Sequence, residues 1–183
     1  MSVPAVEKKK EPGMGQLVVV LLVISAVVAL LLGVVNMVTA PAIAANEEAK
    51  TQQAMTQVLP ADSYEPVDYT DDPTVTAVYK AGDAGYVVQV SPATSFNGGL
   101  SIMVGVGANG ACTGISVVST SETSGLGSNA SKPDWQAQFV GATGEVHVTK
   151  DGGTINAITG ATITSRGVCE AVTSALAAAA SLG

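Results

Sequence analysis

The segment with the most chemical potential lies near the C-terminus, where hydroxyl side chains surround a turn of small residues. It reads Thr159-Gly160-Ala161-Thr162-Ile163-Thr164-Ser165, just before an alanine-rich stretch. Gly and Ala let a phosphorylated ligand approach the backbone without a Cβ clash. A helix starting here would add free N–H groups and a positive dipole end. A threonine hydroxyl could then bind a phosphate or be esterified by one. The alternative is an ordinary helix entry with Thr164 or Ser165 as N-cap.

A second glycine-containing loop follows a strand-type run that ends near Ser119. It reads Glu122-Thr123-Ser124-Gly125-Leu126-Gly127-Ser128. One interpretation is a plain connection between a strand and a helix. The other is a backbone cradle for a flat ring, with Leu126 packed on the ring face and peptide N–H groups at its edge. The spacing alone leaves both interpretations open.

Acid–base and metal chemistry find little support in the sequence. His147 is the only histidine and alternates with Val146 and Val148, which predicts a solvated strand position. No Asp, Glu and His cluster has metal-ligand spacing, and neither G-x-G-x-x-G after a strand nor a G-K-[ST] phosphate loop occurs. We therefore predict no catalytic residues and no metal site, and we disfavour hydrolysis, kinase chemistry and ordinary dinucleotide binding.

The elements expected to position the two loops are mostly strands. An alternating pattern predicts a strand over residues 74–80, and strand-type runs predict others over 86–90, 100–107, 111–119 and 145–150, with 155–158 as a further candidate. Asn109-Gly110 predicts a hairpin, and the acidic segment 62–72 predicts a loop. Helices are predicted over 42–59, whose apolar end should pack on the globular domain, and over 165–180, with Val168, Val172 and Leu176 on one face. Strands flanked by helices predict an α+β domain with an antiparallel sheet.

An uncharged run from Leu17 to Val35, extended by apolar residues to Val38, is long enough to cross a bilayer core of ~30 Å. A cleaved signal peptide is the competing interpretation, because Ala42-Ile43-Ala44 resembles a cleavage site, but the run exceeds a typical signal core. Lys8, Lys9 and Lys10 precede the span, so the N-terminus is predicted to be cytoplasmic. The sequence therefore predicts a cytoplasmic tail over 1–15 and a transmembrane helix over 16–38. A helical connector over 39–60 and an exported domain over 61–183 are predicted to follow.

The charge of the chain bears on nucleic-acid binding, and its two cysteines bear on disulfide formation. The formal net charge is −7, and three of the eight basic residues precede the span, so the exported part is more acidic than the average. An acidic domain with few aromatic residues is not expected to bind nucleic acid. Cys112 and Cys169 could form a disulfide after export, but two buried free thiols are the favoured interpretation.

Together the motifs resemble a known family. The run Thr159–Ser165 resembles the S/T-G-A-T flavinylation motif of membrane-anchored FMN-binding subunits, namely the G subunit of Rnf electron-transport complexes and the C subunit of sodium-translocating NADH:quinone reductase. The run Glu122–Gly127 resembles their E-T-x-G-L-G loop, and Trp135 with Phe139-Val140-Gly141 matches the aromatic spacing beyond it. The single span and small domain resemble the Rnf protein more closely.

The resemblance implies FMN bound covalently to Thr162 through a phosphodiester, attached by a flavin transferase that takes the FMN part of FAD. It also implies electron transfer between the other membrane subunits of an ion-translocating complex. The cofactor-binding residues implied are those of the two loops: Thr162, Thr159, Gly160, Ala161, Thr164, Ser165, Glu122, Thr123, Gly125, Leu126 and Gly127. Arg166 could pair with the phosphate or face solvent.

Two positions depart from the family pattern. Asn156 stands where an Asp usually precedes the modified Thr, and Ser124 stands where Pro is common. Asn keeps the hydrogen-bonding shape of Asp but loses its charge. The alternative function from a different class is a membrane-tethered ligand- or partner-binding module without a redox cofactor.

Overall fold

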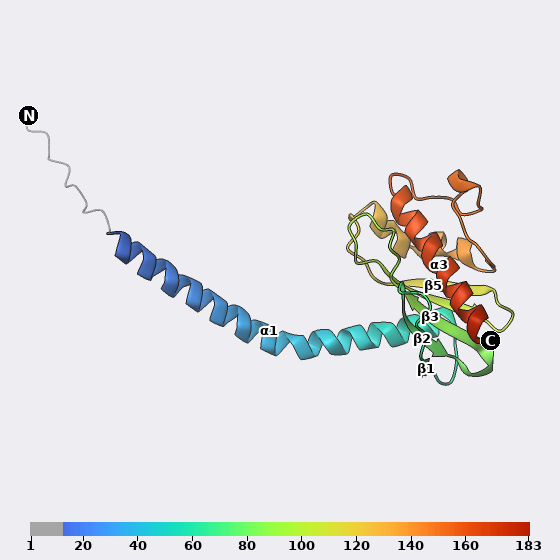
Figure 1. Ribbon diagram of the computed structural model, residues 1–183, viewed down its shortest axis with the longest axis horizontal. Helices are drawn as coiled ribbons and strands as arrows, with labels where there is room; N and C mark the ends of the chain where they lie inside the picture. Colours follow the sequence, from blue (N-terminus) through green and yellow to red (C-terminus); the bar gives the residue numbers. More distant parts are fainter. Residues whose placement is uncertain (1–12) are drawn as a thin grey trace, which may run out of the picture. The chain divides into compact units, whose positions relative to one another are not determined.

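The computed structural model describes residues 13–183, which fall into two compact units divided between Glu47 and Glu48. Helix α1 (Met14–Val58) crosses that division and includes Pro41 (Figure 1). In the described part of the chain it is the one helix long and apolar enough to span a membrane. Its large apolar side chains from Leu17 to Val38 are about half or more exposed, as expected for a helix that is apolar all round.

The predicted boundaries of the membrane segment remain predictions. The span predicted over 16–38 and the connector over 39–60 lie largely on this one continuous helix. The lysines that set the predicted orientation, residues 8–10, lie outside the described residues.

The second unit is built on a five-stranded sheet in which every neighbouring pair is antiparallel. The strands follow sequence order: β1 (Glu65–Val67), β2 (Val75–Lys80), β3 (Gly85–Val90), β4 (Ser101–Gly107) and β5 (Cys112–Ser119). The β4–β5 hairpin turns at the predicted Asn109-Gly110, where the Gly107 N–H donates to the Ala111 carbonyl at 2.9 Å. The predicted α+β fold with an antiparallel sheet is confirmed.

Short helices connect the strands and carry the chain from β5 to the last helix. They are η1 (Gly82–Ala84), η2 (Gly127–Ser131), α2 (Pro133–Gln136), η3 (Ala137–Phe139) and η4 (Thr149–Asp151). The final helix, α3 (Thr162–Leu182), starts three residues before the predicted position. Its first turn is closed by a hydrogen bond from the Ser165 N–H to the Ala161 carbonyl, at 3.0 Å.

Three strand assignments from the sequence were wrong. The predicted loop 62–72 contains β1, a three-residue edge strand whose exposed Pro66 and acidic surroundings gave no strand pattern. Residues 145–150 and 155–158 form no strands; they share a single isolated bridge between Val148 and Ile155. The valine alternation there reflects burial beside α3, because Val146 and Val148 belong to the main core together with residues of that helix. The Val146 N–H also donates to the Thr173 hydroxyl at 3.0 Å. His147 is exposed, as predicted.

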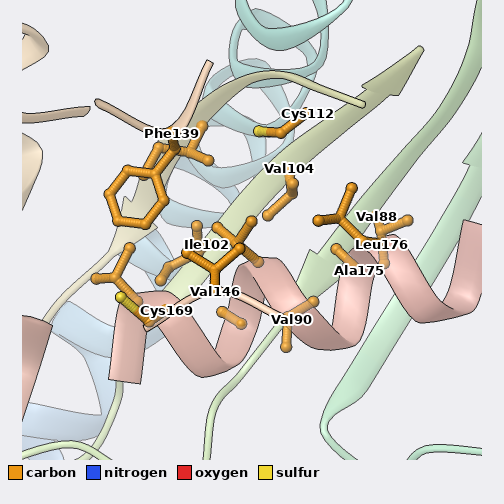
Figure 2. Packing of buried hydrophobic residues seen from close by; sticks show 14 of the residues in the cluster. Val88, Val90, Ile102, Val104, Cys112, Phe139, Val146, Cys169, Ala175 and Leu176 are labelled. Atoms are coloured by element: carbon orange, nitrogen blue, oxygen red, sulfur yellow. The ribbon is translucent and has the colours of Figure 1, made fainter. Parts of the chain in front are cut away.

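The main core lies between one face of the sheet and α3 (Figure 2). Val88, Val90, Ile102 and Val104 point from the central strands toward the helix. The helix contributes the predicted apolar face, since Val168, Val172 and Leu176 are all buried. Burial of these side chains fixes the position of the helix and therefore of its first turn, which carries the hydroxyl segment.

The opposite face of the sheet is covered by the end of α1. Met55 and Val58 are buried against Val87 and Met103 in a second apolar cluster. Glu48–Gly183 forms one compact unit, so this contact lies within it. The prediction that the end of this helix packs on the domain is confirmed.

Both cysteines are buried free thiols, as favoured from the sequence. Burial raises the pKa of Cys112 to about 11 and that of Cys169 to about 12. Neither thiol forms appreciable thiolate near neutral pH, so neither is a nucleophile there.

Candidate functional site

The two loops singled out in the sequence meet at one cavity of about 370 Å³. Its lining includes most of the predicted site residues: Glu122, Thr123, Leu126, Gly127, Gly160, Ala161, Thr162 and Thr164. Phe96, Lys150 and Ile163 complete the lining and were not predicted. The segments that build the cavity are therefore the loop after β5, the start of α3, the chain before β4 and the η4 turn.

A buried carboxylate joins these segments. Glu122 is only 8% exposed, and its two oxygens accept hydrogen bonds from the Phe96 N–H and the Thr164 hydroxyl, both at 2.9 Å. A Cβ atom added at Gly127 would lie 2.6 Å from the Glu122 carboxylate and 2.8 Å from the Thr164 hydroxyl. Glycine at position 127 therefore lets the loop close on α3 without displacing these two side chains.

Thr162 lies at the N-terminus of α3. Ala161 is the N-cap and makes no side-chain cap bond, so Thr162 is the first helical residue. Neither Thr164 nor Ser165 is the N-cap, contrary to that interpretation of the sequence. Thr162 is partly exposed and lines the cavity. The first N–H groups of a helix have no partner within the helix and favour an anion.

The turn before α3 depends on Gly160. Its φ angle is +79°, and an added Cβ would lie 3.1 Å from a methyl carbon of Leu126. A side chain at position 160 would therefore be strained in its backbone and would press on Leu126. Leu126 and Gly160 therefore lie close together, and they belong to the two predicted loops that line the cavity.

Three large apolar side chains in the cavity lining remain open to solvent. Phe96 is 63% exposed, and Leu126 and Ile163 are each 44% exposed. Apolar walls combined with a few hydroxyl, N–H and carboxylate groups are typical of pockets for flat cofactors. Leu126 was among the predicted site residues. Ile163 lies within the predicted run Thr159–Ser165 but was not named as a site residue, and Phe96 lies outside both predicted loops.

The cation at the site is Lys150 rather than Arg166. The Lys150 ammonium donates to the Thr162 hydroxyl oxygen at 3.4 Å. Arg166 instead donates two hydrogen bonds of 2.7 Å to Asp151. The hydrogen bond from Arg166 holds the pKa of Asp151 below its usual range. The suggested pairing of Arg166 with a phosphate is therefore replaced by an ion pair within the chain.

Three predicted residues lie outside the cavity lining. Thr159 is exposed on the turn before α3. Ser165 is fully buried, donates to the Ala161 carbonyl and accepts from the Ile158 N–H, both at 2.9 Å. The Gly125 N–H donates to the Ser128 hydroxyl, also at 2.9 Å. The contacts of Ser165 and Gly125 shape the two loops.

Asn156 contributes its backbone to the structure around the motif. Its carbonyl accepts from the Trp135 indole N–H at 2.8 Å, and its N–H donates to Gln138 at 2.9 Å. Neither bond requires a particular side chain at position 156. The replacement of Asp by Asn therefore leaves these contacts intact.

Comparison with known sequences assigns the class of this domain. The sequence profile described as the FMN-binding domain matches residues 96–177, which include both loops and the first turn of α3. The site described above therefore lies in an FMN-binding domain, and its apolar walls, hydroxyl and helix N-terminus fit a phosphorylated ring.

Relatives are similar over most of the chain. The G subunit of the ion-translocating oxidoreductase complex of Methanosarcina acetivorans is 34% identical over 88% of this chain and 92% of its own length. The G subunit of the Na(+)-translocating ferredoxin:NAD(+) oxidoreductase complex of Acetobacterium woodii is 34% identical over 84% and 85%. The G subunit of the proton-translocating ferredoxin:NAD(+) oxidoreductase complex of Clostridium ljungdahlii is 32% identical over 80% and 81%. The chain belongs to the G subunit family of ion-translocating oxidoreductase complexes.

Proposed function

We propose that this chain is an electron-carrying subunit of an ion-translocating oxidoreductase and that it holds FMN through a phosphodiester to Thr162. The observation that carries the proposal is the position of Thr162. Its hydroxyl is the first of α3 and lines the cavity that both predicted loops form. The named complexes of the relatives support the coarser role in electron transport.

Attachment is a group transfer without a change of oxidation state. The Thr162 oxygen forms a bond to the flavin-side phosphorus of FAD, the bond between the two phosphates breaks, AMP leaves, and the hydroxyl proton is released. A separate flavin transferase is the proposed catalyst. Ile163 and Thr164 lie in the first turn of α3, so their N–H groups would stabilise the phosphate that Thr162 would carry.

The bound flavin supplies the electron transfer, so the chain needs no nucleophile or base of its own. Leu126, Phe96 and Ile163 provide apolar surface that would exclude water from a ring. Glu122 would hold the surrounding loops in place through its bonds to Phe96 and Thr164.

The membrane arrangement is part of the proposal. We place α1 across the membrane with the N-terminus in the cytoplasm and the FMN-binding domain outside, in contact with other membrane subunits of the complex. A covalent link suits that location, because a cofactor lost outside the cell could not be replaced from the cytoplasm. A relative from a Na(+)-translocating complex and one from a proton-translocating complex have similar sequence identity to this chain, 34% and 32%. The proposal therefore does not specify the ion.

A denaturing gel tests the attachment site. The full chain, produced in membranes with a flavin transferase, should give an in-gel fluorescent band that is absent for Thr162→Ala. Thr143→Ala, an exposed threonine away from the cavity, is the matched control and should stay fluorescent. A dark wild-type band would favour the tethered module without a redox cofactor; a fluorescent Thr162→Ala band would place the link elsewhere.

A further inference from the structure

We propose that Lys150 is a positioning residue for flavin attachment: its ammonium holds the Thr162 oxygen and neutralises the phosphate that becomes bonded there. This inference rests on the proposed function. It adds a residue that neither motif contains, since Lys150 lies twelve positions before Thr162.

The first argument is distance. The Lys150 ammonium lies 3.4 Å from the Thr162 hydroxyl oxygen, and both side chains line the same cavity. Lysine carries three donors on a compact charge, so one can contact the bridging oxygen while others reach the free phosphate oxygens.

The second argument is charge. Lys150 is the sole cation in the cavity lining drawn from residues 13–183, and Glu122 is the sole carboxylate there. The Glu122 oxygens accept hydrogen bonds from Phe96 and Thr164. Among the described residues the ion pairs are those of His147 with Glu145 and of Arg166 with Asp151, not Glu122 with Lys150. A phosphate on Thr162 would bring a second negative charge into the cavity, and Lys150 is the group placed to offset it.

The third argument is that the turn carrying Lys150 is tied to α3. Its neighbour Asp151 receives two hydrogen bonds from Arg166, one helical turn beyond Thr162. On the other side, Val148 is fully buried, and the Thr149 N–H donates to the Ile155 carbonyl at 2.8 Å. These anchors keep the exposed Lys150 beside the start of the helix.

The chemistry assigned to Lys150 is electrostatic. An ammonium has no lone pair, so it does not accept the Thr162 proton; that proton leaves to solvent or to a base of the transferase. As the Thr162 oxygen loses its proton and bonds to phosphorus, Lys150 stabilises the charge on this oxygen and on the phosphate.

The test measures the rate of flavin incorporation into the purified flavin-free full chain, supplied with FAD, Mg²⁺ and transferase and followed by intact mass. Lys150→Gln should be slower by about tenfold, the usual scale for one hydrogen bond to a charged group. Lys150→Arg should recover most of the rate because the charge returns. Lys132→Gln, which removes an exposed lysine away from the cavity, should match wild type.

The outcomes separate this inference from the proposed function. A wild-type chain that never gains mass would overturn both. A wild-type chain that gains mass at the same rate as Lys150→Gln would overturn only the role of Lys150. Thermal unfolding of each variant accompanies the assay, and a slow Lys150→Gln that unfolds as wild type does, with rescue by Lys150→Arg, supports the role. A slow Lys150→Gln without rescue by Lys150→Arg would overturn it.

Discussion

The Thr164 hydroxyl donates a 2.9 Å hydrogen bond to the Glu122 carboxylate, across 42 positions of sequence. Thr164 is 1% exposed and Glu122 is 8% exposed, so this contact between two cavity-lining residues is buried. It joins the loop after β5 to the first turn of α3, and these two segments provide most of the cavity lining.

Replacing Glu122 should therefore destabilise the domain. Glu122→Ala leaves the Thr164 hydroxyl and the Phe96 N–H without their partner, and an unsatisfied buried polar group costs about 1–3 kcal/mol. Urea unfolding of the full chain in detergent measures the loss. Glu145→Ala, at a carboxylate that is 83% exposed, is the control and should change little. Equal stability of the two variants would refute a structural role for Glu122.

Gly127→Ala tests how tightly the same loop closes. Its added methyl would lie within 3 Å of Glu122 and Thr164, so we expect a loss of roughly 1–3 kcal/mol from overpacking. Ser124→Ala, at an exposed position in the same loop, should unfold at the wild-type urea concentration. Unchanged stability of Gly127→Ala would show that the loop is looser than described.

The ion pair between Asp151 and Arg166 should give a defined pH dependence. The pKa of Asp151 is lowered from 3.8, chiefly by the hydrogen bond from Arg166, so the unfolded chain binds this proton more readily. The stabilisation is present above pH 3.8 and is lost as the pH falls through the lowered pKa. Wild type should be more stable than Asp151→Asn near neutral pH, and unfolding curves at decreasing pH should converge. A gap that persists at the acid end would contradict this.

The two cysteines should resist a thiol reagent in the native chain. Both are buried, and burial raises the pKa of each, so access and thiolate content are both low. We expect labelling at about pH 8 to be slow in buffer and complete for both thiols in urea without reductant. Rapid native labelling would contradict the burial, and a chain that stays unlabelled in urea would reveal a disulfide between Cys112 and Cys169.

Local sequence patterns predicted four strands of the sheet, β2 to β5, and the core face of α3. Runs rich in apolar residues predicted β2 to β5, of which β3 and β4 are buried on both faces. The four-residue spacing of Val168, Val172 and Leu176 predicted the buried face of α3. The errors occurred where tertiary contacts override pattern. Val146 and Val148 alternate because they are buried in the core with α3, and β1 pairs through only three residues, one of which is Pro66.

The site was partly predictable because two of its segments have recognisable local sequence patterns. The small-residue turn and the glycine loop carry sequence signatures, and the structure brings them to one cavity. Phe96 and Lys150 reach that cavity from segments with no signature of their own. The pairing of Arg166 with Asp151 likewise joins residues 15 positions apart, which neither periodicity nor charge pattern identifies.

The central claim is the covalent link at Thr162, and mass spectrometry of the full chain tests it most directly. Chain matured with its flavin transferase should exceed its translated mass by one FMN less one water, and fragmentation should place that addition on Thr162. A mature chain with no added mass, under conditions where the transferase modifies a known substrate, would contradict the account.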